Sequence, residues 1–395
     1  MKSASHGEIP SKRIRELDGL RGLAILLVLI WHYLACQLQP AKGTALAYLS
    51  SALHLTWSGV DLFFVLSGFL IAGILFENKA AGNFFSVFYR RRICRIFPLY
   101  YTVLAGYFAA RAALGEHAHF GWLFGNPLPL WRFATFTQNI LVAKAGFTGG
   151  WLGVTWSLAV EEQFYLFLPL LIWVLPPRTI PVVLVALIAA AVALRAFLPG
   201  FVSFVGMPWR ADSLLMGALL AYAVRRRDFA DAVASKRWLL RATLGVLLIG
   251  NALLCTSAMA NWSETGGAFV HFWLALFYSA LLLLALVDTG GWLGRVLRNR
   301  ALVWLGSVSY GVYMFHQIVL GFLHGTVGHA APVLRDSRDA LMTVAALLAT
   351  LLLAALSYYG MERRIVHWGH HFRYQTAPRQ GEAFEASQAV AESSS

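Results

Sequence analysis

The chain has 395 residues, of which 58% are hydrophobic and 13% are charged. Ordinary soluble domains carry about 25% charged residues, so this composition excludes a water-soluble globule. The formal net charge is +13, but the basic residues form small clusters between apolar runs rather than one basic face, which argues against nucleic acid as a partner. The apolar runs are about 17 to 24 residues long, the length that crosses a hydrocarbon core of about 30 Å. We therefore expect an all-α polytopic membrane protein in contact with lipid.

The sequence divides into one large apolar domain between two polar ends. Residues 1–16 are polar and basic, and no Ala-x-Ala-like cleavage site follows the next apolar stretch, so we expect a retained first helix. Residues 17–368 form the expected transmembrane domain. Residues 369–395 are rich in Gln, Ala, Glu and Ser, which predicts a disordered cytoplasmic tail. The cysteines are scattered along the chain, so neither a disulfide framework nor a metal site is expected.

Ten apolar runs predict about ten transmembrane helices. With the N-terminus inside, Lys and Arg are biased about three to one toward the cytoplasm, which supports a bundle with both termini cytoplasmic. Residues 115–154 are expected on the extracytoplasmic side and contain several Trp, Gly and Pro residues, a composition typical of an interfacial or re-entrant segment. The predicted spans are residues 17–38, 55–76, 97–114, 155–175, 180–198, 210–224, 238–254, 269–288, 301–324 and 340–359.

Two ionisable residues of the first span indicate function, because such side chains cost at least a few kcal/mol at mid-depth. Arg21 and His32 are eleven residues apart, which on a helix is about 20° from the same direction and a rise of about 16 Å. Arg21 also fits a snorkelling arginine, and His32 also fits a histidine satisfied by a neighbouring helix. Their shared face favours function for both.

Carboxylates occur at the depth of His32 in two spans that enter from outside. Asp61 either holds the His32 imidazole in one tautomer and stabilises its protonated form, or caps the start of its own helix. Glu161 and Glu162 are adjacent and point to different helix faces, so both cannot serve one site. Ser67 fits helix packing better than it fits a nucleophile.

Arginine residues mark two further positions. Arg92 and Arg95 are three residues apart and suit bidentate phosphate binding, although topology anchors also occur at such boundaries. Arg210 and Asp212 begin another span, where a structural ion pair and a substrate contact are both open.

In the ninth span Tyr310, Tyr313 and His316 recur at intervals of three, and a packed, hydrogen-bonded role is favoured for His316. At the end of the tenth span, Glu362 is most simply part of an interfacial charge cluster. These residues alone therefore do not define a site.

Together these segments resemble the membrane-bound acyltransferase family 3, the group that includes O-antigen and other polysaccharide O-acetylases. The resemblance spans nearly the whole chain in order. It is carried by Arg21, His32, the segment from Asp61 to Gly68, Arg91, Arg92, Arg95, Ile96, Pro98, Tyr100, Trp156, Ser157, Leu158, Glu161, Phe164, Tyr165, Pro169, Arg210, Asp212, Gly217, Ser309, Tyr310, Tyr313, His316, Ser357, Tyr359 and Glu362.

The resemblance implies an O-acyltransferase of the bacterial inner membrane. Acyl-CoA, with acetyl-CoA expected, is the implied donor, and a hydroxyl of an extracytoplasmic or lipid-linked carbohydrate is the implied acceptor. Substrate-binding roles are implied for Trp156, Arg210, Asp212, Tyr310 and His316. Some relatives carry an additional extracytoplasmic hydrolase-like domain; this chain ends shortly after its tenth predicted span, so we expect it to act alone on its acceptor.

The expected mechanism begins at the cytoplasmic mouth. CoA phosphates dock on Arg92 and Arg95, and the pantetheine arm passes Arg21 and carries the thioester toward His32. Arg21, or a backbone donor, then stabilises the oxyanion that forms on the thioester.

At the other end, His32 is the expected general base on the acceptor hydroxyl, oriented by Asp61 or Glu161. A covalent acyl-enzyme on His32 or Ser67 would divide the transfer into two steps. The sequence does not separate these routes.

Three other functions stay open at this point. The acceptor is alternatively a small molecule such as a macrolide. A secondary transporter also has buried charges and about ten helices, but the chain shows no paired, Gly- or Pro-broken helices in two matching halves. A non-catalytic membrane scaffold predicts that replacement of His32 is silent.

Overall fold

The computed structural model describes residues 14–39, 43–114, 121–124, 129–147, 150–198, 200–258 and 266–375, with backbone only for residues 121–122, 254–258 and 266–268. Most of the predicted N-terminal segment 1–16 and of the predicted tail 369–395 therefore lies outside the described residues. The two predicted domain boundaries stay predictions.

Every regular element in these described residues is a helix. The long helices are α1 (Arg15–Ile30), α3 (Gly59–Asn78), α4 (Phe84–Leu114), α8 (Trp156–Val174), α9 (Ile180–Phe197), α11 (Met207–Ala223), α13 (Arg237–Ala258), α14 (Gly266–Val287), α16 (Arg300–Leu323) and α17 (Ser337–Ser357). The short helices are α2 (Ala45–Leu53), α5 (Gly121–Phe124), α6 (Leu130–Ala134), α7 (Gln138–Ala145), α10 (Phe201–Val205), α12 (Arg227–Ser235), α15 (Trp292–Leu297) and α18 (Arg363–Gly369). The 3-10 turns are η2 (His54–Ser58) and η3 (Gly150–Thr155), and the π turns are η1 (Trp31–Ala35), η4 (His324–Gly328) and η5 (Tyr358–Glu362).

Each predicted span overlaps one of the long helices. Within the described residues, 7 helical stretches are long and apolar enough to cross a membrane. The prediction of an all-α polytopic membrane protein is confirmed. The number of crossings and the side on which the termini lie stay predictions.

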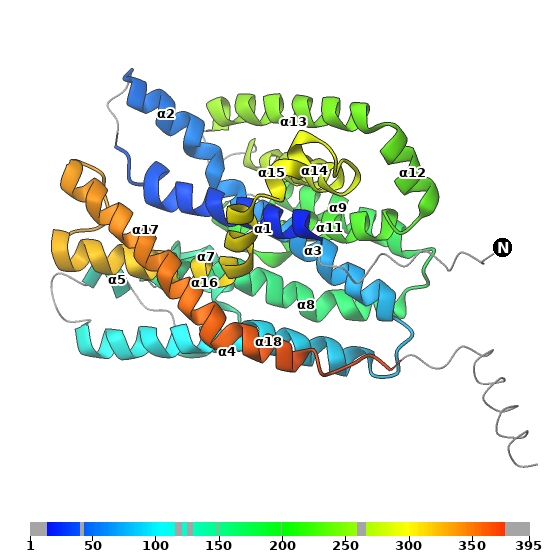
Figure 1. Cartoon of the computed structure of the whole chain (residues 1–395), viewed down its shortest axis with the longest axis horizontal. Coiled ribbons are helices and arrows are strands. Elements are labelled where there is room, and N and C mark those ends of the chain that lie inside the picture. The colour runs from blue at the N-terminus through cyan, green and yellow to red at the C-terminus, as the bar shows by residue number, and fades with distance from the viewer. Residues whose placement is uncertain are drawn as a thin grey trace, which may run out of the picture.

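The first and last described residues lie at the same end of the helical bundle (Figure 1). Near the start, Arg15 NH2 donates to the Arg298 carbonyl at 3.4 Å. Near the other end of the chain, the Gln375 amide donates to Asn83 Oδ1 at 2.9 Å, in the turn between α3 and α4. We call this the terminal end of the bundle.

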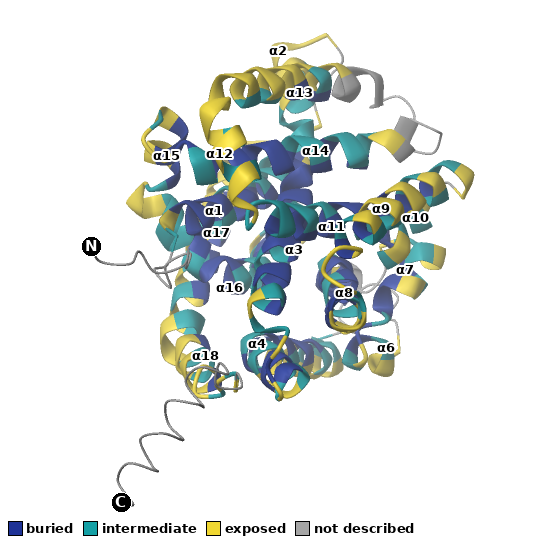
Figure 2. Cartoon of the chain, turned by 90° about the vertical axis from the view of Figure 1, so that its right-hand side faces the viewer, coloured by how far each residue is buried: buried dark blue, intermediate teal, exposed yellow. Residues whose placement is uncertain are grey.

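Helices α3 and α11 form the centre of the bundle, as the end-on view in Figure 2 shows. A Cβ added to Gly68 of α3 would overlap the carbonyl oxygen of Leu214 in α11, so the two backbones are in direct contact. The same holds between α1 and α16, where a Cβ on Gly306 would overlap the carbonyl oxygen of Asp18. Small residues allow such close approach in membrane bundles, where packing replaces the hydrophobic effect between helices.

Large apolar side chains cover the outside of the bundle, and charged side chains lie inside it. Leu248 and Ile249 of α13 and Leu348 and Leu352 of α17 are among the exposed apolar residues. The interior charged and ionisable residues with at most 1% exposure include Asp61, Arg195, Arg210, Asp212 and His316. Apolar side chains outside and charged side chains inside are typical of a protein whose outer surface faces lipid.

Helix α4 begins at Phe84, thirteen residues before the predicted span 97–114. The basic run of residues 90–95 is therefore helical, with Pro98 inside the same helix. Hydropathy marks the part of a helix that lies in hydrocarbon and not the whole helix, which explains the difference.

Candidate active site

A cavity of about 140 Å³ lies among α1, α3, α4, α8 and α16. Its wall combines apolar side chains such as Phe63, Phe64 and Leu70 with three arginines, a glutamate and several hydroxyl groups. Such a mixture of an apolar lining with a few convergent polar groups is typical of a ligand site.

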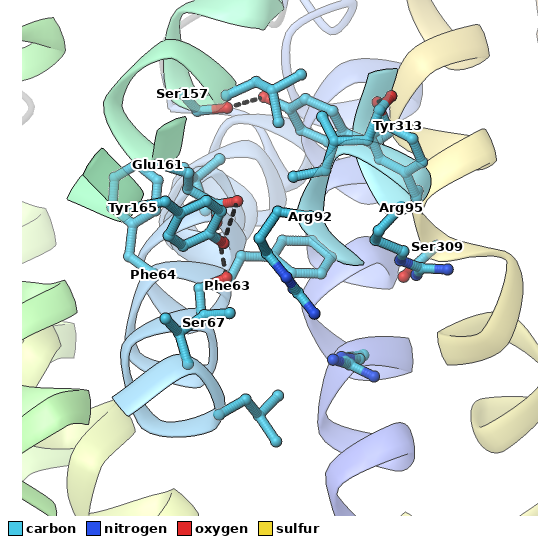
Figure 3. A pocket seen from close by; sticks show the side chains of 17 residues that line it. Phe63, Phe64, Ser67, Arg92, Arg95, Ser157, Glu161, Tyr165, Ser309 and Tyr313 are labelled. Atoms are coloured by element: carbon cyan, nitrogen blue, oxygen red, sulfur yellow. Dashed lines mark hydrogen bonds between the residues drawn. The ribbon is translucent and has the colours of Figure 1, made fainter. Parts of the chain in front are cut away.

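Three guanidinium groups line the cavity: Arg21 of α1, and Arg92 and Arg95 of α4. The three-residue spacing on α4 directs Arg92 and Arg95 to the same side, and both extend toward the cavity in Figure 3. The Arg95 guanidinium lies over the Tyr310 ring, 6.0 Å from its centroid, and the Tyr310 hydroxyl donates to the Ile96 carbonyl at 2.7 Å. Tyr310 therefore supports Arg95 and closes the α4–α16 side of the cavity.

Glu161 faces these arginines from α8. Ser67 Oγ donates to Glu161 Oε1 at 2.9 Å, and the Tyr165 hydroxyl donates to Glu161 Oε2 at 3.1 Å. These bonds fix the carboxylate (Figure 3). Glu162, in contrast, points elsewhere on the helix, and its buried Oε1 has no hydrogen-bond partner among the described residues.

The cavity also reaches Ser157 and Tyr313, which lie above Arg92 in Figure 3. Ser157 Oγ and the Tyr313 hydroxyl are 2.6 Å apart, and the Tyr313 hydroxyl also donates to the Val154 carbonyl at 2.8 Å. The Tyr313 ring lies 5.5 Å from the His316 ring. Tyr313 thus stands between the cavity and a pair of histidines.

His32 and His316 pack against each other with ring centroids 4.8 Å apart. His32 Nδ1 lies 3.0 Å from the Val28 carbonyl, and His316 Nδ1 lies 2.6 Å from the Tyr313 carbonyl. A carbonyl oxygen only accepts hydrogen bonds, so each Nδ1 carries the proton and each Nε2 of the neutral rings carries a lone pair. His316 Nε2 is buried and has no hydrogen-bond partner among the described residues. The pair therefore presents two potential proton acceptors.

A π turn positions His32. Helix α1 passes directly into η1, which contains His32, and Gln37 Nε2 donates to the His32 carbonyl at 3.0 Å. Single π turns inside helices occur frequently at functional sites. Tyr33 in the same turn donates to the His316 carbonyl at 2.9 Å, which ties the two histidine-bearing helices together.

The predicted contact between Asp61 and His32 is replaced by another pair. Asp61 Oδ1 accepts from Arg210 NH2 at 2.8 Å and lies 3.8 Å from His271 Nδ1. In the described structure the hydrogen bond of His32 Nδ1 goes to a main-chain carbonyl, and not to the carboxylate of Asp61 or Glu161. The sequence predicted that Asp61 lies at the depth of His32, but α11 presents Arg210 to it.

Arg210 and Asp212 each form a structural ion pair, one of the two roles that the sequence left open, but their partners are Asp61 and Arg195. Asp212 Oδ2 accepts from Arg195 NH2 at 2.5 Å, and both side chains are fully buried. Residues two apart on a helix point in different directions, which separates Arg210 from Asp212. Neither residue lines the cavity described above, so the expected substrate contact of each stays a prediction.

Trp156 belongs to an aromatic cage around Arg210. The Arg210 guanidinium lies 5.5 Å from the Phe64 centroid, 6.0 Å from that of Trp156 and 5.8 Å from that of Phe204. Trp156 is buried and presents no exposed ring face on which a substrate could stack. Its expected role in substrate binding stays a prediction.

Four residues of these clusters were not singled out as site residues from the sequence. Ser157 and Tyr165 line the cavity, while Arg195 and His271 belong to the buried ion-pair cluster. Arg195 and His271 could have been found as ionisable residues within apolar runs. The roles of Ser157 and Tyr165 depend on helix orientation, which the sequence does not give.

The cavity has donors for anions and no evident metal ligands. Among the described residues, Arg92 and Arg95 form no ion pair with a carboxylate, so their charges are available to an anionic ligand. In the same part of the chain, no three His, Cys, Asp or Glu side chains are grouped as metal ligands would be.

Comparison with known proteins assigns the chain to a family. A family model described as an acyltransferase domain matches residues 14–359. The chain belongs to this acyltransferase family. This match covers the cavity, the histidine pair and the buried ion pairs, so the resemblance seen in the sequence is confirmed.

Several curated members of the acyltransferase family are similar to the chain. The peptidoglycan O-acetyltransferase OatA of Listeria monocytogenes is 25% identical over 90% of this chain and 56% of its own length. The putative peptidoglycan O-acetyltransferase YrhL of Bacillus subtilis is 28% identical over 92% of this chain and 56% of its own length. A putative O-acetyltransferase of Staphylococcus aureus is 25% identical over 78% of this chain and 51% of its own length. The chain thus spans about half the length of these relatives. No solved structure shows significant similarity to it.

Proposed function

We propose that this acyltransferase moves an acyl group, in the first instance acetyl, from cytoplasmic acyl-CoA to a hydroxyl of a carbohydrate on the far side of the bacterial inner membrane. The observation that carries this proposal is the cavity. Its guanidinium groups come from the first halves of α1 and α4, which both begin at the terminal end. Elsewhere on its wall, Tyr313 contacts the ring of His316, next to His32. The terminal end is the cytoplasmic end in this proposal.

The donor site is built by α4 and α1. Arg92 and Arg95 bind the diphosphate of CoA through charge-assisted hydrogen bonds, and the pantetheine arm lies against the apolar wall of Phe63, Phe64 and Leu70. No metal ion is needed for this arrangement, since the guanidinium groups supply the positive charge.

Arg21 belongs with the donor in this proposal. It lines the same cavity as Arg92 and Arg95, and it precedes His32 by about 16 Å along α1. The described wall of this cavity includes Arg21 and neither His32 nor His316. We therefore assign Arg21 to the donor arm or diphosphate and leave the oxyanion to a donor nearer the histidines.

His32 is the general base. Its Nε2 takes the proton from the acceptor hydroxyl while the hydroxyl oxygen attacks the thioester carbonyl carbon. The new C–O bond forms, the C–S bond breaks, and the thiolate of CoA leaves and takes up the proton. The Val28 carbonyl holds His32 in the tautomer that this step requires.

A covalent route remains open beside direct transfer. It would place the acyl group on His32, because Ser67 donates its hydrogen bond to Glu161 and lies on the arginine side of the cavity. Release of CoA in a burst without acceptor would support the covalent route, and strict dependence of CoA release on acceptor would remove it.

A carbohydrate acceptor is favoured by the relatives, two of which carry the name peptidoglycan O-acetyltransferase. A lipid-linked glycan fits the same chemistry. A small molecule such as a macrolide is the second candidate acceptor. Membership of an acyltransferase family argues against a secondary transporter and a scaffold.

Purified chain in detergent tests the proposal directly. We expect release of CoA from acetyl-CoA that depends on an added glycan fragment, with the acetyl group appearing on the glycan by mass spectrometry. Transport of a glycan without acylation, or acylation of macrolides but not of glycans, would contradict it.

A further inference from the structure

The segment that follows α18 binds along the N-terminal part of α4. Helix α18 lies beside α4 at the terminal end of the bundle (Figure 1), and we call residues 370–375 the strap. Asn83 Nδ2 donates to the Arg373 carbonyl at 2.9 Å, and the Gln375 amide donates to Asn83 Oδ1 at 2.9 Å. These paired bonds fix the strap over the start of α4.

The strap also binds an arginine of α4 that does not line the cavity. Arg91 Nε and NH2 both donate to the Phe372 carbonyl, at 3.0 and 2.7 Å. The Arg91 guanidinium lies over the Tyr374 ring, 5.1 Å from its centroid. A guanidinium has five N–H groups, so Arg91 keeps donors for a further acceptor after binding this carbonyl.

Positive charge is concentrated here without neutralisation. In the part of the chain that the structure describes, Arg90, Arg91 and Arg92 form no ion pair with a carboxylate. Burial lowers the pKa of His370, and the charges of Arg91 and Arg92 lower it further. An anion is the ligand that such a cluster binds.

The Tyr374 hydroxyl supplies the second, independent observation. It is buried, and it has no hydrogen-bond partner among the described residues. A buried hydroxyl without a partner is costly, so its position beside Arg91 indicates a hydrogen-bond acceptor that binds there.

We infer that Tyr374 and Arg91, held together by the strap, form a second phosphate subsite, which takes the 3′-phosphate on the ribose of CoA. This inference rests on the proposed function. CoA carries a diphosphate next to its pantetheine arm and a separate phosphate monoester on the ribose. Arg92 and Arg95 face the cavity, while Arg91, one residue before Arg92, faces the strap. The two phosphate groups are thus bound on two sides of α4.

The test compares acetyl-CoA with 3′-dephospho-acetyl-CoA as donors for the full chain in detergent. The wild-type chain should have a lower KM for acetyl-CoA than for 3′-dephospho-acetyl-CoA. Tyr374→Phe removes only the hydroxyl, and it should raise the KM for acetyl-CoA roughly tenfold, as expected for loss of a hydrogen bond to a charged group, with unchanged kcat. The KM for the dephosphorylated donor should stay the same. Tyr48→Phe is the matched control and should change neither KM. Tyr48 is exposed and belongs to α2, which lies at the opposite end of the bundle from the strap (Figure 1).

A binding measurement separates this inference from the proposed function. Adenosine 3′,5′-bisphosphate should raise the melting temperature of wild type and of Tyr48→Phe, and should do so much less for Tyr374→Phe. Equal KM values for the two donors in wild type, or equal effects of Tyr374→Phe on both, would overturn the subsite. Absence of any CoA-dependent acylation together with intact nucleotide binding would instead remove the proposed function.

A phospholipid headgroup also carries a phosphate, so the measurements are repeated with and without phosphatidylglycerol in the micelles. A stabilisation that depends on Tyr374 and on phosphatidylglycerol, but not on the nucleotide, would overturn the assignment to CoA.

Discussion

Replacing Asp61 distinguishes a structural ion pair from a catalytic carboxylate. Asp61→Ala leaves the Arg210 guanidinium, which is fully buried, without its carboxylate at 2.8 Å. Arg210 Nε and NH1 already have no hydrogen-bond partner among the described residues. Removal of one partner of a buried pair costs about 3–5 kcal/mol, because it leaves a charge without compensation. We therefore expect a large loss of stability.

The assay is thermal unfolding in detergent, followed by acetyl transfer at a temperature where the variant is folded. Asp61→Ala should lower the apparent melting temperature by about 5–10 °C and retain most of the kcat of the folded fraction. The double variant Asp61→Leu, Arg210→Met should recover much of this loss, since both charges are removed together. Glu77→Ala, which breaks the exposed ion pair with Arg225, is the control and should cost at most about 1 kcal/mol.

The opposite pattern would refute this reasoning. An Asp61→Ala protein with wild-type melting temperature and abolished kcat would mean that Asp61 acts in the reaction. The double variant would then stay inactive although stable, and the role predicted from the sequence would return.

The remaining predictions concern the donor site, helix packing and metals. Arg92→Ala combined with Arg95→Ala should raise the KM for acetyl-CoA at least tenfold with normal expression; an unchanged donor dependence, measured by CoA release, would remove the phosphate assignment. Gly306→Ala should destabilise the chain by at least about 1–3 kcal/mol, because its Cβ would overlap the Asp18 carbonyl. Gly106→Ala of α4, whose Cβ meets no atom within 4 Å, should be neutral or stabilising in the same melting assay. Incubation with EDTA should leave acetyl transfer unchanged, and a loss restored by one divalent metal would contradict the metal-free site.

Much of the fold was predictable because long apolar runs specify membrane helices directly. All ten predicted spans overlap a helix. The sequence placed Arg92 and Arg95 at the boundary before a span, whereas they lie inside α4. The start of α4 at Phe84 was not predictable from hydropathy, since the basic part of that helix lies beyond the apolar run.

Side-chain partners were harder to predict, because they depend on how neighbouring helices are rotated. The sequence predicted that Asp61 lies at the depth of His32 and left a structural ion pair open for Arg210 and Asp212. The structure pairs Asp61 with Arg210 and Asp212 with Arg195, and neither partner could be named from the sequence. Depth along a helix follows from residue number, but the partner across a helix interface does not.

The surroundings of Glu362, just after α17, could not be predicted from the sequence either. The sequence gives Glu362 as part of an interfacial charge cluster, whereas it is 3% exposed and accepts a hydrogen bond from Ser357 Oγ at 2.8 Å. The π turn η5 carries it inward, and no periodicity in the sequence indicates such a turn.

The most direct test of the account is the acetyl content of surface and periplasmic glycans in a deletion strain. The strain is complemented with wild type or with His32→Ala at matched membrane levels, and O-acetyl groups are measured by mass spectrometry. The account predicts that acetylation is lost in the deletion strain and restored by wild type alone. Full restoration by His32→Ala would contradict the central claim that His32 is the base.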